Sequence, residues 1–230
     1  MKTMNRTSTF VRGILLLTAL GSFAVAHGAM AQAADAVTVA TVAGNGVVDV
    51  PVYIRDASGT PLGIDQPAGS RIQSYSIRVT YAPTVAVQSI TFSRAGITAP
   101  LTPAFESSPA APGSISLLDN FDEATNLIPF TSNAALPGNQ VAHLLVTIAP
   151  GTAPGTLITL TLDPVLTQLT DEGGTPATIE TVANGRLVLV SGSVLVTGAA
   201  EGAAVPMLPP WALVLLAVSL AVVAVRMRIF

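Results

Sequence analysis

Short runs of β-forming residues, separated by turn-forming residues, constrain the fold of this chain more than any other feature. Valine, isoleucine, leucine and threonine recur between Gly, Pro, Asn and Asp, and helical periodicity is nearly absent between the two ends. This pattern is typical of a sandwich of two β-sheets. The sequence therefore predicts an all-β domain with strands at 37–41, 47–55, 72–81, 87–93, 114–118, 126–130, 140–148, 157–162, 166–170, 178–181, 186–190 and 194–196.

Two of these strands indicate how they are buried. In 72–81 the residues alternate, with Tyr75, Ile77, Val79 and Tyr81 on one side and polar residues on the other. This period of two is typical of a strand with one wet face. Residues 141–148 are apolar on both sides apart from His143 and Thr147, which predicts a central strand with neighbours on either edge.

Proline and glycine mark the connections. The stretch 95–113 carries four prolines, at 100, 103, 109 and 112, which predicts a loop or an irregular edge. Turn signals occur at 171–174, at 184–185 and at 191–192, between the last predicted strands.

The N-terminus predicts export. Lys2, Arg6 and Arg12 precede an apolar run at 13–26, and small residues follow up to Ala33. The run is shorter than the roughly 20 residues of a membrane-spanning helix, and Ala31-Gln32-Ala33 has the A-x-A pattern of a signal peptidase site. We predict a signal peptide at 1–33, cleaved after Ala33 or alternatively after Ala31. An uncleaved N-terminal anchor is the other interpretation.

The C-terminus predicts a membrane segment. Residues 211–225 are apolar except for Ser219, and Arg226 and Arg228 follow. At about 1.5 Å per residue, this run reaches some 22 Å of a roughly 30 Å hydrocarbon core, so the span is marginal. The arginines favour the cytoplasmic headgroups and Trp211 the opposite interface, which leaves the domain outside the cytoplasm. A buried core helix is the alternative, although the run is apolar all round.

The start of this tail resembles a class of bacterial sorting signals. Val205-Pro206-Met207-Leu208, with Trp211 in register, resembles the opening of the IPTL-CTERM tails, which are relatives of the PEP-CTERM signals. The resemblance covers 205–230, after a linker at 198–204, and implies a Gram-negative bacterium. It also implies processing by an exosortase-like membrane protease, with the product kept at the membrane or released to the cell surface or extracellular space.

Composition between the two ends excludes several functions. Residues 34–204 hold all thirteen acidic residues and five arginines, a formal charge of −8, and contain no lysine. Such a surface repels phosphate backbones, so we expect no nucleic-acid binding. The absence of cysteine means that the fold depends on core packing without disulfides or thiolate metal sites.

The residues needed for common catalytic sites are also missing. After the leader His143 is the one histidine, and there is no lysine or cysteine. Ser-His-Asp, Cys-His and Schiff-base chemistries therefore lack their required residues or lose most of their options. Asp119, Asp122 and Glu123 lie too near one another in one predicted turn to act as an acid and a base across a cleft. We therefore predict no enzyme and no cofactor.

The same three carboxylates suggest a calcium loop. Asp119, Asp122 and Glu123 supply the hard oxygen ligands that calcium prefers. The segment lacks the spacing and the glycine of an EF-hand, so a solvated acidic loop is the alternative.

Four segments, in chain order, resemble the cohesin family. They are Gly-Asn-Gly-Val-Val-Asp-Val-Pro-Val at 44–52, Ile-Arg-Val-Thr-Tyr-Ala-Pro at 77–83, the strand and turn at 144–155, and Asn-Gly-Arg-Leu-Val-Leu-Val at 184–190. Ala82 replaces the aspartate of the family's Tyr-Asp-Pro. The resemblance implies a nine-stranded jelly-roll sandwich at 34–197 that recognises a partner without catalysis. In cellulosomal cohesins the partner is a dockerin, but no dockerin-binding residues are matched here.

Two functions remain open. One is an exported module for protein interaction, with a dockerin-like or envelope partner, or for envelope or extracellular-matrix structure. The other is a carbohydrate-binding module for a polysaccharide, which usually needs exposed aromatic rings. The domain's aromatic residues, several of them in core phase, are Tyr53, Tyr75, Tyr81, Phe92, Phe105, Phe121 and Phe130. Their scarcity favours the interaction module.

Overall fold

The structure is a computed structural model that describes residues 33–67, 69–121, 126–131, 135–171 and 178–198. Within these ranges all regular structure is β-strand except for two short 3-10 helices, η1 at Thr84–Ala86 and η2 at Gly96–Thr98. This confirms the predicted all-β class. The helices described there include none that is long and apolar enough to cross a membrane. The predicted tail at 205–230 and all but Ala33 of the predicted signal peptide lie outside the described residues.

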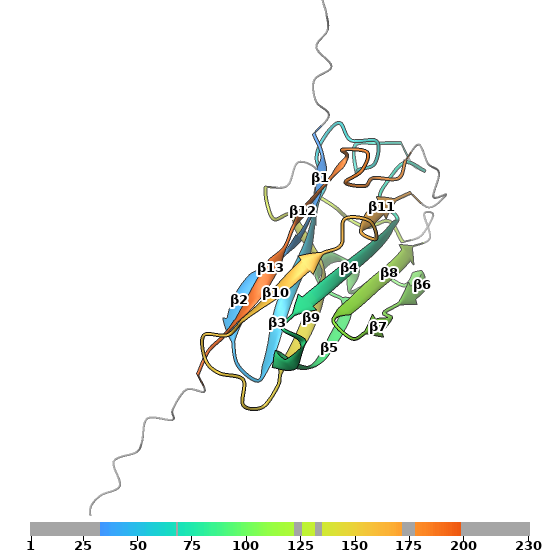
Figure 1. Cartoon of the computed structure of the whole chain (residues 1–230). Coiled ribbons are helices and arrows are strands. Elements are labelled where there is room, and N and C mark those ends of the chain that lie inside the picture. Colours follow the sequence, from blue (N-terminus) through green and yellow to red (C-terminus); the bar gives the residue numbers. More distant parts are fainter. Residues whose placement is uncertain (1–32, 68, 122–125, 132–134, 172–177, 199–230) are drawn as a thin grey trace, which may run out of the picture. The chain divides into compact units, whose positions relative to one another are not determined.

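The strands form two sheets that lie face to face (Figure 1). Sheet A has the order β12-β1-β3-β9-β5, with β9 between β3 and β5 as predicted for a central strand. Its strands are β1 (Asp35–Val39), β3 (Val47–Arg55), β5 (Val87–Arg94), β9 (Asn139–Ile148) and β12 (Leu187–Val190).

Sheet B has the order β2-β13-β10-β4-β8-β6, and it faces the viewer in Figure 1. Two shorter strands extend it, since β11 pairs with β4 and β7 pairs with β8. The strands are β2 (Thr41–Gly44), β4 (Ser74–Ala82), β6 (Pro103–Ser107), β7 (Ala110–Ala111), β8 (Ser114–Phe121), β10 (Leu157–Leu162), β11 (Gln168–Thr170) and β13 (Gly192–Val196).

The first and last strand regions each contribute to both sheets. β1 runs parallel to β12 in sheet A, and after Ala40 the chain continues as β2, which runs parallel to β13 in sheet B. β12 likewise passes into β13 at Ser191. The predicted turn at 191–192 is therefore wrong: the chain stays extended there and changes sheets. These breaks, together with the short β7 and β11, give thirteen strand segments in the described residues, where the cohesin resemblance implied nine.

Other boundaries show where local patterns succeed. The predicted strands at 47–55 and 157–162 match β3 and β10 at both ends. The predicted strand at 126–130 is wrong, because these residues form no strand, although Ile128 and Phe130 are buried. The predicted strand at 178–181 is reduced to one bridge, between Glu180 and Leu169. The proline-rich stretch contains the edge strand β6, whose register shifts after Pro103, which confirms an irregular edge.

One hydrophobic core fills the space between the sheets. Alternate residues of the strands point into it, and the buried members include Val37, Val50, Val52, Ile54, Tyr75, Ile77, Val79, Leu117, Phe121, Leu144, Val146, Ile158 and Leu160. This confirms the predicted inner side of 72–81, with Tyr81 only half-buried. Each large apolar side chain buried in this way contributes roughly 1.5–3 kcal/mol. In the absence of cysteine, this core holds the two sheets together.

Candidate functional site

The outward side of sheet B is formed by alternate residues of its central strands. In β10, Leu157, Thr159 and Thr161 point outward, while the residues between them are buried. β4 alternates from Ser74 to Thr80 and β8 from Leu117 to Phe121, which places Ser76 and Leu118 on the same side, opposite each other in register. We call the surface formed by these five residues outer face B.

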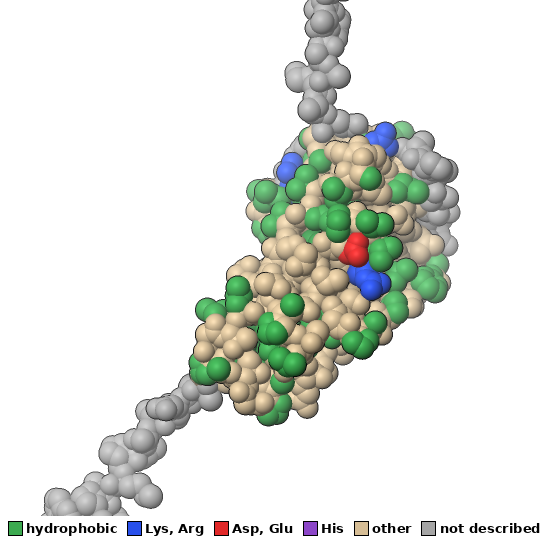
Figure 2. Space-filling view, viewed as in Figure 1, with side chains coloured by type: hydrophobic (Ala, Val, Ile, Leu, Met, Phe, Trp, Pro, Cys, Tyr) green, Lys and Arg blue, Asp and Glu red, His purple; other side chains and the backbone are tan. Residues whose placement is uncertain are grey.

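Exposed apolar side chains lie at both ends of outer face B. Leu157 is 51% exposed, and its register partner in β13, Leu195, is 42% exposed. On the other side Phe105 of β6, which is 54% exposed, lies opposite Asn120 of β8. Figure 2 shows this side of the sandwich as mostly uncharged, with one acidic and one basic group near its middle. A mixed apolar and uncharged surface is typical of the centre of a protein–protein interface, which is depleted in charged residues.

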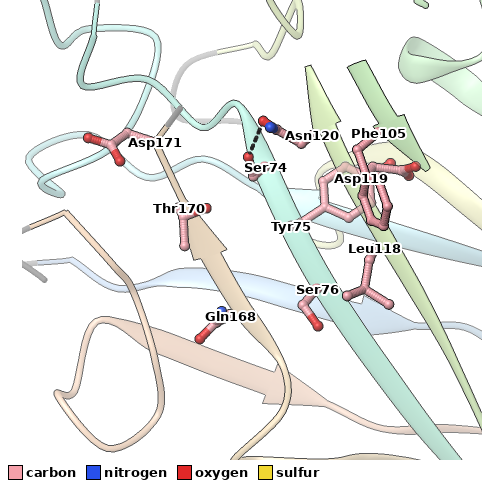
Figure 3. A pocket seen from close by; sticks show the side chains of 10 residues that line it. All are labelled: Ser74, Tyr75, Ser76, Phe105, Leu118, Asp119, Asn120, Gln168, Thr170 and Asp171. Carbon is pink, nitrogen blue, oxygen red and sulfur yellow. Dashed lines mark hydrogen bonds between the residues drawn. The ribbon is translucent and has the colours of Figure 1, made fainter. Parts of the chain in front are cut away.

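An open pocket of about 270 Å³ lies in this surface. β11 supplies one wall, β8 and β6 supply the other, and β4 runs between them (Figure 3). The lining residues are Ser74, Tyr75, Ser76, Phe105, Leu118, Asp119, Asn120, Gln168, Thr170 and Asp171. The Ser74 hydroxyl donates to Asn120 Oδ1 at 2.6 Å, a bond drawn in Figure 3. Pockets that enclose small-molecule ligands are usually larger, about 300–1,000 Å³, so this recess suits a side chain of a partner better than a free substrate.

Asp119 lies in β8 and not in the predicted turn. It follows Ile115 and Leu117 on the inner side of the strand, is 2% exposed, and faces Tyr75 across the β4–β8 pair. Burial raises the pKa of Asp119 to about 6, while the nearby Tyr75 hydroxyl and Arg94 guanidinium act in the opposite direction. Neither carboxylate oxygen has a hydrogen bond of good geometry. The period of two in 115–121 was the signal that could have placed this carboxyl in the core.

Of the three residues of the predicted calcium loop, the structure describes Asp119. Asp122 and Glu123 lie outside the described residues, and the Asp119 carboxylate is turned into the sandwich. Within the described ranges, no three histidine or acidic side chains are grouped to hold a metal ion. The calcium loop stays a prediction, but its first residue is in a strand.

His143 lies on the outward side of sheet A, as a partly exposed strand histidine. Its side chain is 24% exposed, and Nδ1 lies 3.1 Å from Oδ1 of Asp49 on the neighbouring strand β3. No serine or threonine hydroxyl among the described residues is hydrogen-bonded to it. The pair acts as a cross-strand contact, which fits the structural role expected from the sequence.

The aromatic rings do not form a shared exposed surface. Four of them are buried, namely Tyr75, Phe92, Phe121 and Phe130. Tyr53 and Tyr81 are half-buried on different sheets, which leaves Phe105 as the exposed ring of the described residues. The stacking platform that a carbohydrate-binding face needs is therefore not formed by them.

The fold resembles solved cohesin domains. The third cohesin of ScaC from Acetivibrio cellulolyticus, solved in complex with the ScaB dockerin, matches with a TM-score of 0.50 and 18% identity over 71% of this chain and 99% of that chain. The seventh type I cohesin of ScaB from Pseudobacteroides cellulosolvens matches with a TM-score of 0.50 and 19% identity over 74% of this chain and 96% of that chain. No protein-family model and no curated protein matches the sequence. The described domain therefore has a cohesin-like fold.

Proposed function

We propose that this chain is an exported, non-catalytic interaction module that binds a protein partner through outer face B. The observation that carries the proposal is the surface itself, which is mostly uncharged (Figure 2). Leu157 and Leu195 are exposed at one end of it, and the exposed Phe105 lines a recess of side-chain size at the other end. Exposed apolar patches on soluble domains commonly mark sites of association. The likeness to a cohesin solved with a dockerin supports a protein partner, either of dockerin type or from the cell envelope.

The strand boundaries support export with processing at both ends. β1 begins at Asp35, two residues after the proposed cleavage at Ala33. β13 ends at Val196, nine residues before the proposed sorting motif starts at Val205. Removal of the signal peptide, and of the tail by an exosortase-like protease, would therefore leave every described strand in place. Mass spectrometry of the mature protein from cell fractions tests this part: a C-terminus near Val205 supports sorting, and an intact tail in the inner membrane contradicts it.

The binding proposal is tested by photo-cross-linking from two matched positions. A photoreactive residue replaces either Thr161, exposed on β10 in outer face B, or Thr91, exposed on β5 on the outward side of sheet A. Both are exposed strand threonines, so the two variants differ mainly in which sheet carries the probe.

We expect the Thr161 probe to give a discrete protein adduct in the envelope fraction, and the same protein to bind the purified chain. The Thr91 probe should give no such adduct. Equal adducts from both positions would contradict the proposed face. Binding to polysaccharide without any protein adduct would contradict the proposed class of partner.

A further inference from the structure

The start of β1 is tied to the loop that follows β3. Asp35 is fully buried, and its backbone N–H donates to the carbonyl oxygen of Arg186 at 3.0 Å. Its side-chain Oδ1 accepts the backbone N–H of Ala57 at 2.7 Å. This one residue therefore connects the first strand to the segment before β12 through its backbone, and to the loop after β3 through its carboxyl group.

Glu180 holds the same loop from another direction. It is also fully buried, and it forms two backbone hydrogen bonds with Leu169, of 2.8 and 3.1 Å. Its Oε1 accepts the backbone N–H of Leu62 at 3.3 Å. The loop after β3 is thus fixed by Asp35 at one point and by Glu180 at another.

Among the described residues, the second oxygen of each carboxyl group has no hydrogen-bond donor. Asp35 Oδ2 and Glu180 Oε2 are both buried and accept no hydrogen bond from a described donor. The two side chains are near enough to hydrogen-bond each other. Two ionised carboxylates have no donor between them and repel each other, so this contact requires a proton or another positive charge. An uncompensated pair of this kind, away from water, is strongly unfavourable.

We propose that Asp35 and Glu180 share one proton and form a pH-sensitive latch that holds β1, the loop after β3 and the segment before β12 together. We call this pair the carboxyl latch. Its state does not depend on the identity of the partner bound at outer face B, which is formed by other strands.

The charges around the latch are few and mostly acidic. Asp56 interacts with both members and is 1% exposed, and its Oδ2 accepts the Ile64 N–H at 2.8 Å. The negative charge of Asp65 raises the pKa of Asp56, while the positive charge of Arg186 lowers the pKa of Glu180. The acidic neighbours favour retention of the shared proton, and Arg186 opposes it.

The direction of the pH effect follows from this arrangement. Burial raises the pKa of Asp35, and the negative charge of Glu180 raises it further. Burial also raises the pKa of Glu180, although the hydrogen bond from Asp35 opposes that change. A carboxyl group whose pKa is higher in the folded state stabilises the fold at low pH, and this stability is lost as the pH rises through the folded value. The latch should therefore weaken between neutral and alkaline pH.

This chain offers a clean background for the measurement. It has no cysteine, and its single lysine, Lys2, precedes the domain. Tyrosine titrates near pH 10 and histidine near 6.5, so few other groups change charge between pH 7 and 9.

The test is the melting temperature of the full-length chain between pH 7 and 9. The wild-type Tm should fall by roughly 6–11 °C, because one bound proton over two pH units is about 2.8 kcal/mol and 1 kcal/mol shifts Tm by roughly 2–4 °C in a domain of this size. Asp35→Asn keeps an acceptor for Ala57 and supplies a permanent donor to Glu180, so its Tm should stay nearly constant over this range. Glu180→Gln should behave in the same way. Asp49→Asn is a control at the exposed partner of His143, and its Tm should fall between pH 7 and 9 as much as that of the wild type.

Three results would overturn the latch. One is a wild-type Tm that does not change with pH. Another is a fall in Tm between pH 7 and 9 that is as large in both Asp35→Asn and Glu180→Gln as in the wild type. The third is a slope that disappears when 1 mM Ca²⁺ is added, because a metal ion would then neutralise the pair. If neither variant folds, infrared spectroscopy of the wild-type chain decides: the band of a protonated carboxyl group should be present at pH 7 and weaker at pH 9, and a band of equal strength at both values would overturn the latch.

Discussion

Gly192 lies directly against Ala40: a Cβ atom on Gly192 would be 2.2 Å from the Ala40 carbonyl oxygen and 2.5 Å from that of Val39. This contact lies where β1 passes into β2 and β12 passes into β13. The first and last strand regions therefore change sheets side by side, and the absence of a side chain lets their backbones approach.

Gly192→Ala should be strongly destabilising, because the new Cβ meets backbone atoms that cannot move aside without separating the paired strands. We expect a loss of more than about 3 kcal/mol in the free energy of unfolding, measured in urea. Gly151→Ala is the control: Gly151 has a φ of +81° but open space around it, so it should lose only about 1 kcal/mol. Similar losses of unfolding free energy in the two variants would contradict the close approach of the two strand regions at Gly192 and Ala40.

Asp119→Asn should make the protein more stable at pH 8. Burial holds the pKa of Asp119 at about 6, above its ordinary value near 3.9, so its contribution to stability is complete at low pH and is lost as the pH rises through 6. The neutral amide avoids this loss, and we expect a gain of about 2 kcal/mol at pH 8 with none at pH 4. If the carboxylate served a calcium ion instead, the variant would be less stable at pH 8, and that result would restore the calcium interpretation.

His143→Ala should change little. The pair with Asp49 lies on a partly exposed strand surface, and exposed ion pairs contribute less than about 1 kcal/mol. Urea unfolding should show a loss within that range, and binding to the cross-linked partner should be unaffected. A large loss of binding would instead place the interaction surface on sheet A.

Local alternation explains which parts of the fold could be predicted. β3 and β10 alternate regularly between turn residues, and both were predicted at their observed bounds. The 126–130 segment also carries apolar residues, but Ile128 and Phe130 reach the core from an irregular segment, which a local pattern does not distinguish from a strand. The change of sheets at Ala40 was missed because extended backbone continues through it, and the one at Ser191 because the Ser-Gly pair was interpreted as a turn.

The candidate sites were harder to predict because their residues come from distant segments. Asp35 and Glu180 are 145 positions apart by their numbers. In the local sequence Asp35 is a polar residue before a predicted strand, and Glu180 is a polar residue within another. Outer face B depends on the pairing of β10, β4 and β8, which the sequence did not specify. In contrast, the structural role of His143 was predicted, since its apolar neighbours and the lack of catalytic partners are visible locally.

The central claim is that outer face B binds the partner, and paired charge substitutions test it most directly. Thr161→Arg places a long charged side chain in the middle of that surface, and Thr91→Arg places the same side chain on the opposite sheet. The dissociation constant of the cross-linked partner should rise at least about 100-fold, roughly 2.7 kcal/mol, for Thr161→Arg and less than about 3-fold for Thr91→Arg. Unchanged affinity in Thr161→Arg, or a larger loss in Thr91→Arg, would contradict the account.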